Sequence, residues 1–186
     1  MCAVLKYRLK KTVVLVGMMG SGKTAVGQAL GRLLGVPFLD SDNEITVAAN
    51  LTIPEIFERY GEPFFREKES QVIARLLEGG PAILSTGGGA YLSGDNREMI
   101  SARGVAVWLR ADLDLLWSRV RHKNTRPLLR TADPYKTLAD LCERRQPYYA
   151  KADLVADARA EYAIEEMAQK VADVLASRDD VLEMTE

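Results

Sequence analysis

One glycine-rich segment near the amino terminus constrains the fold more than any other part of the chain. Residues 17–24, GMMGSGKT, fit the pattern G-x-x-x-x-G-K-[ST]. The segment follows a β-branched, apolar stretch at 12–16 and precedes a stretch at 24–34 with apolar residues at helical spacing. A strand, a glycine-rich loop and a helix in this order surround an anion with backbone N–H groups and a helix N-terminus. The segment therefore predicts a phosphate-binding loop.

The chemistry of such a loop gives roles to Lys23 and Thr24. The lysine can reach the β- and γ-phosphates of a nucleotide, and the threonine hydroxyl can coordinate Mg²⁺. The alternative is a glycine-rich turn whose lysine is only solvated, which the strand and helix on either side disfavour. A nucleotide-binding domain is therefore expected, but the loop alone does not define a reaction.

The rest of the chain alternates short apolar stretches with patterns typical of helices, which predicts parallel βαβ units. We expect one α/β domain over residues 1–186, with its core near 12–176. Polar stretches near 40–66 and 123–136 are expected to be inserts, and the polar tail from 177 is expected to fray. The predicted strands are 12–16, 38–40, 82–84, 105–109 and 153–155, and the predicted helices are 24–34, 45–49, 53–60, 64–77, 96–103, 112–121, 137–145 and 161–176.

Composition excludes several classes of function. The 25 Lys and Arg residues against 26 Asp and Glu give a net charge of −1, so no bulk positive field attracts nucleic acid or an anionic membrane. No apolar run reaches the roughly 18 residues of a membrane helix. One histidine and two distant cysteines cannot form a histidine-based zinc site. Basic residues before the 12–19 stretch are typical of a secretory leader, but no small-x-small cleavage pattern follows, and a cytoplasmic location is expected.

Two carboxylates follow the second predicted strand. Asp40 and Asp42 are expected at the ligand crevice, because the carboxyl ends of parallel strands converge there. Beside a phosphate site they suit water-mediated Mg²⁺ coordination and activation of a hydroxyl. Asp42 before 43–45 is equally good capping chemistry for a helix N-terminus. Both interpretations stay open at this stage.

A second glycine run and several arginines complete the candidate site. Residues 85–89, STGGG, end a predicted strand, and three consecutive glycines indicate that a ligand approaches the backbone closely. The acid that usually follows such a strand on the magnesium side is absent, which gives Asp40 and Asp42 more weight. Arginine is suited to bidentate recognition of carboxylate and phosphate. The candidates are Arg66, Arg119, Arg126, Arg144 and Arg145, and Arg126 lies in the polar loop expected to act as a lid.

Six motifs in order resemble the shikimate kinase family over nearly all of residues 12–175. They are 17–24, DSD at 40–42, GEPFFREKE at 61–69, GGG at 87–89, RPLL at 126–129 and RQPY at 145–148. The resemblance implies a three-layer P-loop kinase fold with a central parallel sheet, helices on both faces, a substrate-binding insert and a lid. It also implies ATP and Mg²⁺ as cofactors and a monomer. Asn50 stands where the family usually has glycine, and little effect is expected because asparagine tolerates positive φ.

The resemblance also implies a role for each matched residue. Asp42 corresponds to the candidate base at the shikimate hydroxyl, and Asp40 to the acid near magnesium. Arg66 and Arg145 correspond to the pair that grips the shikimate carboxylate. The nucleotide would be bound by Gly20, Ser21, Gly22, Lys23, Thr24, Ala25, Arg119 and Arg126, with Arg121 an alternative to Arg119 near adenine. The substrate would be bound by Asp42, Phe57, Phe65, Arg66, Glu69, Gly87, Gly88, Gly89 and Arg145.

The expected activity is ATP-dependent phosphorylation of the shikimate 3-hydroxyl in aromatic amino-acid biosynthesis. Lys23, Arg126 and Mg²⁺ would neutralise the developing charge while Asp42 orients or deprotonates the hydroxyl. One alternative is another small-molecule kinase, such as a gluconate kinase, which does not need Arg66 and Arg145 together. A second alternative is a non-catalytic nucleotide-binding module, against which the presence of Lys23, Asp42 and Arg66 counts.

Overall fold

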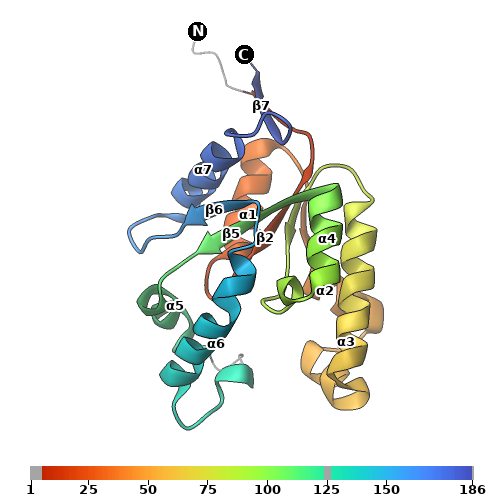
Figure 1. Cartoon of the computed structure of the whole chain (residues 1–186), viewed down its shortest axis with the longest axis vertical. Coiled ribbons are helices and arrows are strands. Elements are labelled where there is room, and N and C mark those ends of the chain that lie inside the picture. The colour runs from red at the N-terminus through yellow and green to blue at the C-terminus, as the bar shows by residue number, and fades with distance from the viewer. Residues whose placement is uncertain (1–5, 124–126, 186) are drawn as a thin grey trace.

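The chain forms a parallel sheet with helices on both faces (Figure 1). This computed structural model describes residues 6–123 and 127–185, and Arg126 lies outside them. The five-stranded sheet has the order β3-β4-β2-β5-β6, all parallel. Its strands are β2 (Thr12–Val16), β3 (Phe38–Asp40), β4 (Ile83–Ser85), β5 (Gly104–Arg110) and β6 (Leu154–Asp157). The helices are α1 (Lys23–Leu34), α2 (Ser41–Ala49), α3 (Ile53–Leu77), α4 (Gly94–Arg103), α5 (Leu113–Val120), α6 (Pro134–Tyr149) and α7 (Ile164–Leu175), with 3₁₀ turns η1 (Ala90–Leu92) and η2 (Pro127–Leu129).

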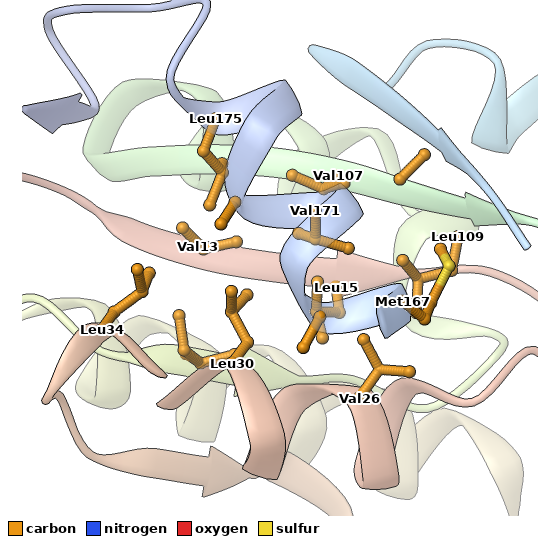
Figure 2. Close-up of a cluster of buried hydrophobic side chains, with 14 of the residues drawn as sticks. Val13, Leu15, Val26, Leu30, Leu34, Val107, Leu109, Met167, Val171 and Leu175 are labelled. Carbon is orange, nitrogen blue, oxygen red and sulfur yellow. The ribbon is translucent and has the colours of Figure 1, made fainter. Parts of the chain in front are cut away.

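The central strand β2 explains the three layers. All of its residues are buried, and successive side chains point to opposite faces of the sheet. Val13 and Leu15 join a core with α1 and α7, where Leu30 and Val171 meet them (Figure 2). Val14 and Val16 join the core on the other face, which α3, α4, α5 and α6 cover. The predicted α/β fold with helices on both faces is confirmed.

The tail does not fray as expected. Strand β7 (Leu182–Thr185) pairs antiparallel with β1 (Lys6–Leu9), so the two ends of the described chain lie side by side (Figure 1). Val181 and Leu182 are fully buried in the α1–α7 core. Because the tail is polar overall, its sequence did not indicate that these two apolar residues would be buried.

Several helix boundaries differ from those predicted, each for a local reason. Helix α2 begins at Ser41 rather than at 45, because Asp40 caps it. The predicted helices 53–60 and 64–77 are joined, with a kink at Gly61 (φ 81°, ψ 169°). Helix α6 begins at Pro134 and continues past Pro147 to Tyr149, since a proline near a helix end removes only one hydrogen bond. Asn50 ends α2 with φ 51°, as the tolerance of asparagine for this region predicts.

The segment after β3 has a small core of its own. Ile45 from α2 packs with Ile56 and Phe65 from α3, and all three side chains are buried. This cluster fixes both helices as one unit beside the carboxyl end of β3. The boundaries predicted for the substrate-binding insert and for the lid remain predictions. Within the two described ranges, no helix has the length and apolar character needed to cross a membrane.

Candidate active site

One large cavity lies where the parallel strands end, as expected for an open α/β sheet. Its volume is about 1570 Å³. The phosphate-binding loop, the end of β3 and the glycine run after β4 all line it. The cavity also reaches Arg159 and Tyr162 between β6 and α7, and Met167 near the start of α7, none of which was identified from the sequence. The segment after β6 follows the carboxyl end of a predicted strand, and this position in the sequence could have indicated that it lies at the cavity.

The phosphate-binding loop has the conformation that an anion cradle requires. Gly17, Gly20 and Gly22 all have positive φ. A Cβ on Gly20 would lie only 2.8 Å from Val120 Cγ1, so that position needs glycine for space as well as for conformation. Lys23 Nζ donates to the Gly17 carbonyl at 2.7 Å and to the Met18 carbonyl at 2.9 Å. These bonds hold the ammonium group at the loop, where it faces the space for a phosphate.

Arg119, rather than Arg121, reaches the phosphate-binding loop and the cavity. Its Nη1 donates to the Gly20 carbonyl at 3.0 Å, and its side chain lines the cavity. Arg121 is exposed and its Nε donates to His122 Nε2. Arg144 is also exposed and its Nε donates to the Asp140 carbonyl. The geometry therefore favours Arg119 for contact with the nucleotide and leaves Arg144 on the surface.

Asp40 at the end of β3 and Asp42 at the start of α2 have different positions, which bear on the two interpretations that the sequence left open. The cap of α2 is Asp40, whose Oδ1 accepts from the Asn43 N–H at 3.1 Å. The alternative in which Asp42 caps a helix is therefore wrong. Asp42 lies in the first turn of α2, lines the cavity and has a buried Oδ1. This position is compatible with the role predicted for Asp42 at a substrate hydroxyl.

The residues named for magnesium offer the donor atoms that this ion prefers. The exposed Thr24 hydroxyl and the Asp40 carboxylate both line the cavity, and hard oxygen donors suit Mg²⁺. In the described part of the chain, no group of three or more His, Cys, Asp or Glu side chains forms a metal cage. A nucleotide-bound Mg²⁺ needs only one or two protein ligands, so the residues fit the ion.

Each glycine of the run after β4 leaves room for a different functional side chain. A Cβ on Gly87 would lie 3.0 Å from Asp42 Oδ1, and one on Gly88 would lie 2.9 Å from Arg145 Nη1. On Gly89 it would lie 2.6 Å from Arg66 Nη1. The three glycines thus bring one carboxylate and two guanidinium groups to the same strip of backbone. A methyl group at any of the three positions would displace the side-chain end that lies there.

Arg66 is oriented by acidic residues on its own helix. Its Nη1 donates to Glu69 Oε1 at 2.9 Å, and Glu62 Oε1 lies 3.4 Å from Nε. The Glu69 side chain is 1% exposed, and burial raises its pKa while Arg66 opposes the rise. Phe57 and Phe65 stack with ring centres 4.8 Å apart, and Arg66 lies 5.2 Å from the Phe65 ring. These aromatic rings form an apolar side of the cavity next to the guanidinium.

One buried tyrosine at the site was not identified from the sequence. Tyr149 donates from its hydroxyl to the Gly88 carbonyl at 2.6 Å. It lies four residues after Arg145, and side chains at this spacing share one face of a helix. The predicted end of that helix at Arg145 concealed the relationship.

Comparison with known proteins places the chain among kinases. A family model described as shikimate kinase matches residues 19–176. The chain belongs to the shikimate kinase family. A shikimate kinase of Ruegeria pomeroyi is 65% identical over 177 residues, which cover 95% of this chain and 91% of the relative. The structure of shikimate kinase from Acinetobacter baumannii in complex with shikimate has a TM-score of 0.85 and 39% identity, covering 90% of this chain and 93% of that one. The predicted shikimate kinase family and P-loop kinase fold are confirmed.

A gluconokinase from Sinorhizobium meliloti 1021 has a lower likeness. Its TM-score is 0.62 at 18% identity, over 91% of this chain and 94% of that one. This likeness extends to the fold alone. Shikimate kinases are more similar to the chain in both sequence and structure, so the gluconate kinase alternative loses support.

Proposed function

We propose that the protein transfers the γ-phosphoryl group of ATP to the 3-hydroxyl of shikimate. Membership of the shikimate kinase family and 65% identity over most of the chain support this reaction. The observation that carries the proposal is the convergence of Asp42, Arg66 and Arg145 on the glycine run. A small polyol acid requires this set, because its carboxylate needs a cation and its reacting hydroxyl needs a carboxylate.

The two arginines would grip the carboxylate of the substrate. Arg66 is oriented by Glu69 beside Gly89, and Arg145 approaches Gly88 from α6. Arginine holds a carboxylate through paired hydrogen bonds, which fix orientation as well as adding affinity. With the carboxylate held there, the ring of the substrate would lie along Phe57 and Phe65, and a hydroxyl would be directed toward Asp42.

Asp42 would orient the attacking hydroxyl and accept its proton. The transition state of phosphoryl transfer is loose, so little deprotonation is needed before the bond to phosphorus forms. Orientation is therefore the larger part of the role of Asp42, and removal of the proton completes the reaction. Its partly buried position in the first turn of α2 fixes the carboxylate relative to Gly87.

The phosphate groups would be held by the loop between β2 and α1. Backbone N–H groups of residues 20–25 and the positive end of α1 would surround them. When the nucleotide binds, Lys23 would leave the two loop carbonyls that it contacts and bind the phosphates instead. Thr24 and Asp40 would hold Mg²⁺, directly or through water, and the ion supplies charge neutralisation at the phosphates. Arg126 lies outside the described residues, and its role on the transferring phosphate remains part of this proposal.

The decisive experiment measures ADP release with Mg·ATP in the presence of shikimate, quinate or gluconate. Strong stimulation by shikimate supports the proposed reaction. Stimulation by gluconate alone would retain the kinase and replace the substrate. Bound ATP with no stimulation by any acid would leave a non-catalytic nucleotide-binding module. Chromatography with light scattering would test the predicted monomer, and cell fractionation the predicted cytoplasmic location.

A further inference from the structure

Tyr149 connects three parts of the candidate site. The side chain is 1% exposed, and its ring packs on Trp108 with centres 6.0 Å apart. The hydroxyl lies 2.6 Å from the Gly88 carbonyl and 3.9 Å from the sulfur of Met18 in the phosphate-binding loop. A tyrosine hydroxyl carries one proton, and the short distance commits that proton to the Gly88 carbonyl. Its lone pairs are then available to a neighbouring donor.

The nearest candidate donor is the guanidinium of Arg145, one turn earlier on α6. A Cβ added to Gly88 would lie 2.9 Å from Arg145 Nη1 and 3.6 Å from the Tyr149 hydroxyl. Both groups therefore lie beside the same glycine. Burial raises the pKa of the Tyr149 hydroxyl, and the neighbouring guanidinium opposes that rise. The hydroxyl, the guanidinium and the Gly88 carbonyl therefore lie in one compact polar cluster, in which the hydroxyl donates to the carbonyl.

We infer that Tyr149 is a positioning residue that holds the Gly88 peptide and the Arg145 guanidinium in the orientation that receives the carboxylate of the substrate. The inference rests on the proposed function. Glu69 orients Arg66 through an ion pair, and Tyr149, beside the same glycine as Arg145, is placed to orient Arg145 while its hydroxyl holds the Gly88 carbonyl. A neutral hydroxyl leaves the positive charge of Arg145 available for the substrate, whereas a carboxylate partner would partly neutralise it.

The test is Tyr149→Phe, which keeps the ring against Trp108 and removes only the hydroxyl. The KM for shikimate is expected to rise about five- to tenfold, the scale of one lost hydrogen bond. The KM for ATP and kcat are expected to change by less than about twofold, because Tyr149 acts on the carboxylate-binding side. In an Arg145→Ala background, the same substitution should raise the KM for shikimate less than it does in the wild type, because part of its effect acts through that arginine.

Tyr91→Phe is the matched control. Tyr91 is also 1% exposed, belongs to the same core and donates to a backbone carbonyl, that of Lys151, at 3.3 Å. Neither tyrosine lines the cavity, but only Tyr149 donates to a carbonyl of the glycine run. Both variants lose a buried hydroxyl and a similar part of their thermal stability, but only Tyr149→Phe should raise the KM for shikimate. Equal KM changes in both variants would show a general loosening of the core and overturn the inference.

The outcomes separate this inference from the proposed function. A wild-type protein that does not phosphorylate shikimate would refute the proposed function and the inference with it. Wild-type turnover together with an unchanged KM in Tyr149→Phe would overturn the inference alone. If circular dichroism shows that Tyr149→Phe does not fold, Tyr149→His replaces it. The shorter imidazole keeps a ring but cannot reach the Gly88 carbonyl, so the same rise in KM is expected, and an unchanged KM would overturn the inference.

Discussion

A methyl group on Gly89 would lie 2.6 Å from Nη1 of Arg66, closer than real Cβ atoms approach other groups. The guanidinium therefore occupies the space that every other residue type would fill. The backbone at Gly89 does not require positive φ, since its φ is −91°. The requirement for glycine comes from the neighbouring arginine alone.

Gly89→Ala should consequently damage substrate binding without unfolding the protein. The methyl group would displace the flexible end of Arg66, and a misplacement of about 1 Å can cost up to about 100-fold in catalysis. We expect kcat/KM for shikimate to fall at least about tenfold, with a melting temperature close to that of the wild type. Gly80→Ala is the control, because a Cβ there meets nothing within 4 Å. A normal kcat/KM in Gly89→Ala would show that Arg66 does not bind the substrate from this position.

Asp42→Asn tests the group at the reacting hydroxyl. The change removes the negative charge and the proton acceptor while keeping size and shape. Turnover should fall about 100-fold or more, the scale of a lost acid–base group. Equilibrium binding of ATP, measured by calorimetry, should remain as in the wild type because the phosphate-binding loop is intact. Unchanged turnover would remove Asp42 from the reaction.

Arg66→Ala tests the carboxylate clamp. Loss of a charge-assisted pair costs about 1.5–3 kcal/mol, or roughly 10- to 100-fold in the KM for shikimate. Arg75→Ala is a matched control on the same helix. Arg75 is exposed and forms an ion pair with Glu44 at 2.8 Å, and neither residue lines the cavity. An unchanged KM for shikimate in Arg66→Ala would contradict the clamp.

Glu69 should give the site a pH dependence. Burial raises its pKa above the ordinary 4.5. A carboxyl with a raised folded-state pKa stabilises the fold below about pH 4.5, and this contribution is lost as pH rises through the raised value. Below that raised value Glu69 is protonated and holds Arg66 less strongly. Thus, as pH falls through it, the KM for shikimate should rise in the wild type.

Glu69→Gln is the control for that pH dependence. Its amide cannot titrate and holds Arg66 weakly at every pH. The KM of this variant for shikimate should already be elevated at pH 7. It should rise less in acid than that of the wild type, because residue 69 no longer takes up a proton. Identical pH profiles for the variant and the wild type would assign the rise to another group, such as the substrate carboxyl.

The sequence predicts the parts of this structure that depend on local pattern. The apolar stretch before Gly17 predicts β2, and the apolar spacing after Lys23 predicts α1. The resemblance also placed Asp42, Arg66 and Arg145 at one site, where the structure brings them together. The rest depends on contacts between distant residues. Tyr149 was missed because a proline near the end of α6 suggested an earlier stop.

Other differences follow from the same cause. Capping by Asp40 or by Asp42 depends on the direction in which the chain leaves β3, which residue type alone does not specify. The β1–β7 pair joins segments more than 170 residues apart, so no local pattern indicates it. The order of the strands in the five-stranded sheet likewise comes from packing, although the number of strands in that sheet follows from apolar stretches along the chain.

The β1–β7 pair has a mechanical consequence. Lys6 faces Thr185 at the open end of the ladder, and Leu9 faces Leu182 at the end nearer the core. A force that separates the two ends would load these hydrogen bonds one pair at a time, as in unzipping, rather than shearing them together. The ladder lies before the amino end of β2, while the phosphate-binding loop follows its carboxyl end. Stretching should thus peel the two end strands away at low force, while the phosphate-binding loop at the opposite end of β2 stays folded.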